Sequence, residues 1–139
     1  MPFSGGPITV TIGSIPAVTA EMDRKVTATT VTIASGAAVS GVLDLRDYAM
    51  AILTLPAGWD AADIGVQVCA TADGTFTPLL DQYNAYGENV SIDGPVAAKS
   101  YALPPWAFPA QYVKVWSHNG SGVNVNQTAD RIIGVQLKS

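Results

Sequence analysis

The sequence predicts an all-β fold: an antiparallel β-sandwich, jelly-roll or immunoglobulin-like, with an extended N-terminal arm. Short runs of alternating apolar and polar residues recur along the chain, and turn residues separate them about every eight to twelve positions. No stretch shows the sustained periodicity of a helix. The 139 residues suffice for one core, so we expect an arm over residues 1–22 and a sandwich domain over residues 23–139.

The expected arm carries one strand pattern, in which Ile8, Val10 and Ile12 form an apolar face. A lone strand this short is unstable in water, because ordering each residue costs about 1–2 kcal/mol of backbone entropy. The pattern therefore predicts that the arm adds to a sheet edge. Glycines and prolines on both sides of this strand pattern favour an edge on a neighbour, either an adjacent subunit or the shell to which the protein attaches.

Two strands are expected at the centre of the domain. Residues 48–55 are apolar on both alternating faces, which predicts a strand buried on both sides. Residues 64–71 alternate, which predicts one buried face. Asp73-Gly74 suits the positive φ angles of a tight hairpin turn, and residues 76–80 are expected to run back.

The other expected strands are shorter or lie nearer the chain ends. Residues 104–109 contain three prolines and are expected to form at most one helical turn. A brief edge strand is expected near Val123. The remaining strands are expected at residues 26–33, 39–45, 90–92, 99–103, 111–117 and 131–138.

The composition limits the classes of partner. Charged residues make up 13% of the chain, about half the usual quarter. Either a surface rich in Ser, Thr and Asn accounts for this, or neighbouring subunits cover part of the surface. The net charge of −4 and seven scattered basic residues argue against nucleic acid as a partner. We expect no membrane partner, because the first residues lack the basic segment and long apolar run of a signal peptide, and no apolar run approaches about eighteen residues.

We expect no catalytic residue, cofactor or metal. His118 adjoins the Asn119-Gly120 turn and is expected to be a solvated loop residue without a triad. Asp60 is expected to cap one helical turn over residues 58–64, a reading favoured over a cation pair with Asp63. Cys69 is the only cysteine, which excludes an internal disulfide. A weaker alternative is calcium held by carboxylates of four loops, although no EF-hand motif is present: Asp73, Asp81, Glu88 and Asp93.

The aromatic residues allow two interpretations. They could form a platform on which sugars stack, or they could anchor the core and interfaces. Trp59 follows a strand-ending proline and is expected to cover one end of the core. The candidate aromatic anchors are Trp59, Tyr83, Tyr86, Trp106 and Trp116.

Three sequence features resemble small structural proteins encoded in tailed-bacteriophage genomes. They are P-x-x-W at residues 56–59, T-x-D-G-T-F at residues 71–76 and V-x-Q-x-A-D-R at residues 125–131, and the resemblance covers roughly residues 30–138. It implies a virion protein assembled in the bacterial cytoplasm, without a catalytic motif. The favoured implication is a homotrimeric capsid decoration (cement) protein that binds the major capsid protein or other virion subunits. The alternative is a tail-fibre, neck or baseplate component with a carbohydrate- or receptor-binding sandwich.

Overall fold

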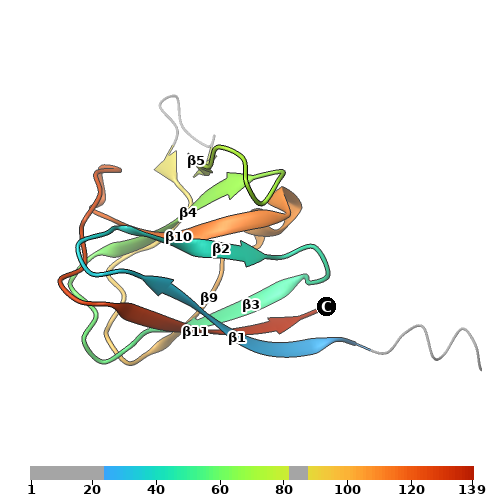
Figure 1. Cartoon of the computed structure of the whole chain (residues 1–139), viewed down its shortest axis with the longest axis horizontal. Helices are drawn as coiled ribbons and strands as arrows, with labels where there is room; N and C mark the ends of the chain where they lie inside the picture. Colours follow the sequence, from blue (N-terminus) through green and yellow to red (C-terminus); the bar gives the residue numbers. More distant parts are fainter. Residues whose placement is uncertain (1–23, 82–87) are drawn as a thin grey trace, which may run out of the picture.

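Two antiparallel sheets pack face to face in the computed structural model, which describes residues 24–81 and 88–139 (Figure 1). The first sheet has the order β1 (Val26–Ile33), β11 (Arg131–Lys138), β3 (Met50–Thr54) and β9 (Ser100–Ala102). The second has the order β2 (Val39–Asp44), β10 (Tyr112–His118), β4 (Asp63–Cys69) and β5 (Thr77–Pro78), with β8 (Ser91–Ile92) also paired to β4. A two-stranded ribbon joins β6 (Leu80–Asp81) to β7 (Glu88–Asn89). The predicted β-sandwich is confirmed.

The core lies between the sheets, and alternate residues of the long strands line it. In β4, Ile64 and Val66 are buried, as their period-two pattern predicts, whereas Val68 is half-buried and Ala70, expected on the same face, lies beyond the strand and is exposed. The three predicted inward residues of β11 are buried as well, namely Ile133, Val135 and Leu137. Alternation therefore identified the inner face of both strands. The predicted arm lies outside the described residues.

The prediction for residues 48–55 is wrong on one face. Ala51 and Leu53 of β3 are 5% and 0% exposed, but Met50 and Ile52 are 50% and 43% exposed. Only the inner face of the sheet packs against the second sheet, so in the described chain the apolar outer residues of β3 face solvent. The composition of β3 is thus that of a strand buried on both faces, although its outer face is exposed to solvent.

The turn after β4 also differs from the prediction. β4 and β5 do pair, with Val68 opposite Thr77. Gly74, however, has no positive φ, and its N–H donates to the carbonyl of Thr71 at 3.5 Å. Gly74 is the fourth residue of this turn, and an added Cβ would lie 2.5 Å from both Sγ of Cys69 and Oγ1 of Thr71, so these two side chains would have to shift. The glycine therefore serves close approach and not a positive φ.

Two further predictions about local structure are corrected. The 3-10 helix η1 (Pro105–Ala110) has six residues and is longer than one turn, with Pro105 at its start, where no N–H donor is needed, and Pro109 inside it. The edge strand expected near Val123 is reduced to a single bridge between His118 and Asn124. Among the described residues, none of the helical segments has the length and apolar character of a membrane span.

Candidate functional site

The outer face of the first sheet carries exposed apolar side chains at the end where β1 begins, and a row of Thr30, Gly134, Thr54 and Ser100 separates them from Ile132. The strand registers place Val26, Lys138 and Met50 in one cross-strand row and Ala28, Gln136, Ile52 and Ala102 in the next. Val26 is 71% exposed, and Ile132, at the far end of β11, is 58% exposed. We call this surface the apolar face, and define it by Val26, Met50, Ile52, Ala102 and Ile132.

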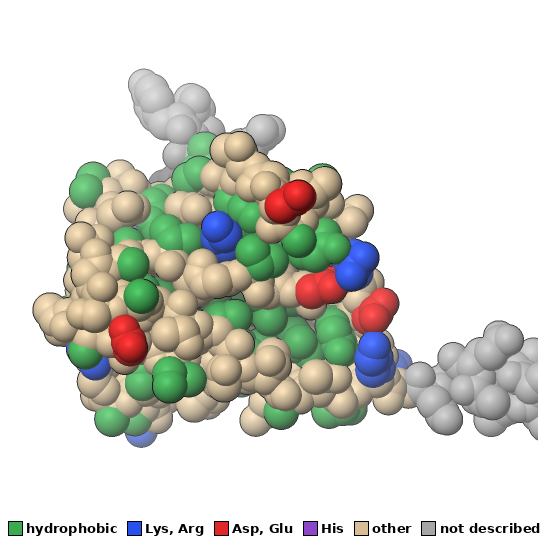
Figure 2. All heavy atoms as spheres, in the orientation of Figure 1, with side chains coloured by type: hydrophobic (Ala, Val, Ile, Leu, Met, Phe, Trp, Pro, Cys, Tyr) green, Lys and Arg blue, Asp and Glu red, His purple; other side chains and the backbone are tan. Residues whose placement is uncertain are grey.

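Charge is scarce on the apolar face. Lys138 is the single charged residue that the described registers place on it. Two exposed ion pairs lie near the ends of β1 and β2, Lys25–Asp47 at 3.0 Å and Arg46–Asp44 at 2.8 Å. Figure 2 shows the edge view of the sandwich, where charged side chains are also few and sit mostly at one end. Exposed apolar side chains grouped on a sheet face with little charge are typical of a protein-binding site.

One end of the apolar face is hollowed. The hollow has a volume of about 520 Å³ and lies between the sheet and η1. The sheet contributes Met50 and Ile52, while the other wall carries Leu103, Pro105 and Phe108. Val26 and Lys138 also line it, at the end of the sheet where β1 begins. We call this feature the apolar hollow. Its shape and chemistry suit an extended apolar segment.

A second hollow, of about 800 Å³, lies over the outer face of β4 and β10 and is polar. Its floor contains Trp116 and His118, whose rings stack with centroids 4.4 Å apart. Both side chains are buried, at 3% and 1% exposure. Nε2 of His118 lies 3.3 Å from Oγ of Ser91, and Nδ1 contacts the backbone oxygen of Asn119. The rim includes Asp63, Asn89 and Asp93, and we call this feature the polar hollow.

The prediction that His118 is a solvated loop residue is therefore wrong. His118 is the last residue of β10, and the chain after it folds back so that Asn124 bridges to His118. The N–H of Asn119 donates to the carbonyl of Val123 at 2.9 Å, which closes this loop. The turn signal in the sequence was real, but the loop covers the histidine and does not expose it.

The tryptophans do not form a common platform. Trp59 is 7% exposed in the core, and its Nε1 donates to the carbonyl of Ala62 at 3.3 Å. Trp116 is buried, and its Nε1 donates to Oδ1 of Asn124 at 2.7 Å. Trp106 lies on η1 and is 64% exposed. Two of the three indoles are thus unable to offer a face to a sugar, and Tyr83 and Tyr86 lie outside the described residues.

Asp60 does not cap a helix, because residues 58–64 form no helix. Its carboxylate accepts a 2.6 Å hydrogen bond from the N–H of Thr128, and its Oδ2 lies 3.3 Å from Nη2 of Arg131. The backbone N–H of Thr128, followed by its hydroxyl and the Arg131 guanidinium, lowers the pKa of Asp60. The N–H of Asp60 donates to Oε1 of Gln127 at 2.9 Å, and Gln127 is fully buried. Asp60 therefore joins the β3–β4 connection to the segment before β11.

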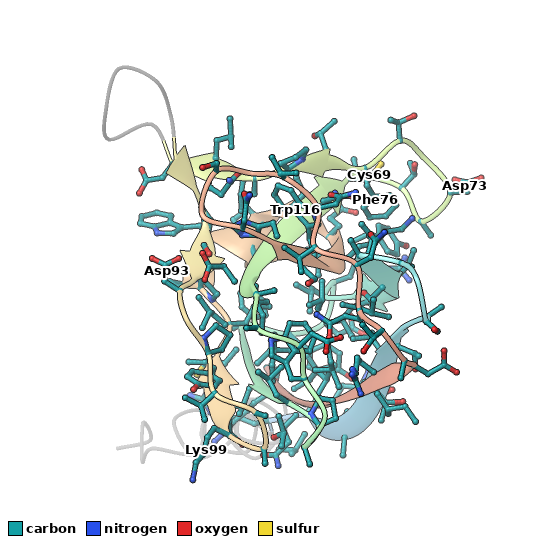
Figure 3. All side chains as sticks on the ribbon, turned by 90° about the vertical axis from the view of Figure 1, so that its left-hand side faces the viewer. Cys69, Asp73, Phe76, Asp93, Lys99 and Trp116 are labelled. Atoms are coloured by element: carbon teal, nitrogen blue, oxygen red, sulfur yellow. The ribbon has the colours of Figure 1, made fainter. Side chains whose placement is uncertain are left out.

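Two of the four carboxylates considered for calcium are far apart. Asp73 and Asp93 lie on opposite sides of the molecule (Figure 3). Asp63 instead accepts a hydrogen bond from the N–H of Gly94 at 2.8 Å. In the described segments, no group of three metal-ligating acidic, histidine or cysteine side chains comes together.

Sequence reasoning missed the residues that matter most on the apolar face. Met50 and Ile52 were assigned to a strand buried on both sides, and the low charge of the chain was left with two explanations. Taken together, the two signals point to an exposed apolar sheet face. Neither signal alone says which side of the strand is open.

The arrangement defines a β-sandwich whose most marked surface feature is an apolar sheet face. No protein-family model matches the chain, and no curated protein matches it. Among solved structures, it is similar to the SPBc2 prophage-derived protein YomS, with a TM-score of 0.54 and 11% sequence identity. The match covers 85% of this chain and 96% of that chain. At this identity the likeness is one of fold.

Proposed function

We propose that the protein is a structural subunit of a bacteriophage particle that binds other virion subunits through its apolar face. The observation that carries the proposal is the exposure of Met50 and Ile52 on a sheet face where, among the described residues, only Lys138 is charged. The fold likeness to a prophage-derived protein and the resemblance of three sequence features to phage structural proteins support the phage assignment. The role is assembly and not catalysis.

The place that we propose is the outside of the capsid, where the protein acts as a trimeric decoration (cement) protein on the major capsid protein. Covering an Ile or Met side chain fully contributes about 1.5–3 kcal/mol relative to leaving it exposed. Several such side chains are needed, because association itself costs at least about 4 kcal/mol. A face with little charge favours burial, since few ionised groups must lose water.

Particle binding tests this proposal. Ile52→Lys and, at the other end of the face, Ile132→Lys put a charge into the proposed interface and should weaken binding to particles that lack the protein by tenfold or more. Val42→Lys is the matched control, because Val42 is 39% exposed on β2 in the opposite sheet. Equal binding of all three variants and the wild type would contradict the proposal. Copy number locates the protein: a decoration protein should be about as abundant as the major capsid protein, and a tail component far scarcer.

The polar hollow favours a second candidate function, a carbohydrate- or receptor-binding module of a tail fibre, neck or baseplate. Carboxylate, amide and hydroxyl groups of Asp63, Asn89, Ser91 and Asp93 line it, and these groups pair with sugar hydroxyls. Asp93→Ala should then abolish binding to host surface polysaccharide while leaving particle incorporation intact. Absence of any polysaccharide binding by the wild type would exclude this candidate.

A further inference from the structure

The apolar hollow lies beside the point where the N-terminal residues join the sandwich. Val26, the first residue of β1, lines the hollow and is 71% exposed. Residues 1–23, which contain the strand pattern Ile8, Val10 and Ile12, are joined to it through Arg24 and Lys25. The chain therefore contains both an apolar segment and an apolar hollow that could bind such a segment.

The residues just before β1 set the direction in which the chain continues. The N–H of Lys25 donates to Oγ of Ser139 at 2.8 Å, and the N–H of Ser139 donates to the carbonyl of Lys25 at 2.9 Å. Nη1 of Arg24 donates to the carbonyl of Ser139 at 3.1 Å. These bonds extend the β1–β11 ladder beyond Val26, so Lys25 and Arg24 run past the end of the sheet. A segment that continues in the direction of Lys25 and Arg24 reaches the hollow of a neighbour without turning back.

The dimensions fit an exchange between neighbours. A strand from Ile8 to Ile12 is about 13 Å long at 3.3 Å per residue. The stretch between Ile12 and Arg24 can span up to about 40 Å. An arm segment that lies in the hollow, over the outer face of β3 and beside η1, could bury its apolar side chains against Met50, Ile52 and Phe108.

We propose that the apolar hollow of one subunit binds residues 8–12 of a second copy of this chain. The inference rests on the proposed function, since it names the partner that occupies one end of the apolar face. Repeated between neighbours, this exchange closes a ring such as the proposed trimer. The rest of the face, including Ile132, is left for other virion subunits.

Disulfide trapping of the full-length protein tests the exchange. In a Cys69→Ser background, Val10→Cys combined with Ile52→Cys should form covalent dimers and larger species under mild oxidation, seen on a non-reducing gel. Mixing the two single-cysteine variants should give dimers only. Val10→Cys combined with Val42→Cys, which lies on the opposite sheet, should stay monomeric. A disulfide within one chain, or no disulfide between residues 10 and 52, would overturn the proposal.

Self-association provides the non-covalent test. Val10→Asp and Ile52→Asp should each weaken self-association in sedimentation equilibrium by tenfold or more. A mixture of the two variants should regain heterodimers, because one intact arm then meets one intact hollow. If both variants associate as the wild type does, the arm does not bind in the hollow. If disulfide trapping fails while Ile52→Lys and Ile132→Lys still reduce particle binding, the exchange is wrong and the proposed function stands.

Discussion

Gly65 provides the space in which Trp116 lies. A Cβ added to Gly65 would be 2.8 Å from Cε3 of Trp116 and 2.9 Å from Cδ2 and Nε2 of His118. The two residues are direct partners in the β4–β10 ladder, and the His118 ring stacks on the indole. A glycine on β4 therefore allows two large rings of β10 to lie flat over the outer face of the second sheet.

Gly65→Ala should destabilise the protein by about 1–3 kcal/mol, because the added methyl group overpacks a site filled by two rings. Urea unfolding measures the change. Gly41→Ala is the control: Gly41 lies on β2, where an added Cβ meets nothing within 4 Å, so its free energy of unfolding should stay close to that of the wild type. Equal unfolding midpoints for the two variants would contradict this packing.

His118→Ala should lower the free energy of unfolding by about 2 kcal/mol or more, because it removes a buried ring and its contact with Ser91. Asp93→Ala, an exposed change on the rim of the same hollow, should stay within about 0.5 kcal/mol of the wild type. A His118→Ala protein as stable as the wild type would mean that the ring is not held in the floor of the polar hollow.

Trp59→Ala should cost about 3–5 kcal/mol, since Trp59 is buried in the core. Trp106 is the matched control, because it is 64% exposed, and Trp106→Ala should cost little in the isolated protein. Denaturant unfolding of both variants gives the comparison. A loss below about 1 kcal/mol for Trp59→Ala would show that the indole lies on the surface.

Acid should weaken the hydrogen bonds and the ion pair that join Asp60 to the segment before β11. The pKa of Asp60 is lowered in the folded state, so its stabilisation is present above the unfolded pKa of about 3.9. It is lost as the pH falls through the lower folded pKa. Asp60→Asn should therefore flatten the fall in Tm with pH below about 4, since Asn cannot titrate there. Thr128→Val keeps the main hydrogen-bond donor to Asp60, the backbone N–H, and should keep most of the dependence of Tm on pH.

The sequence by itself determined which residues of the long strands face the core. In β4 and β11, polar and apolar residues alternate, and a pleated strand allows only one assignment of faces once a core exists. The expected strands in these regions were found, because alternation and turn residues are local properties. The two-sheet architecture follows from many short strands and no helical period.

Only the tertiary structure decided what covers the other side of each strand. His118 is buried because Ser91 and the loop to Asn124 lie over it, although an adjacent turn suggested exposure. Asp60 accepts a hydrogen bond from Thr128, 68 residues away, and so joins two loops instead of capping a helix. Ile52 is exposed although its strand is apolar throughout. Side-chain period reports the two faces of a strand, but the burial of each face depends on segments that are distant in sequence.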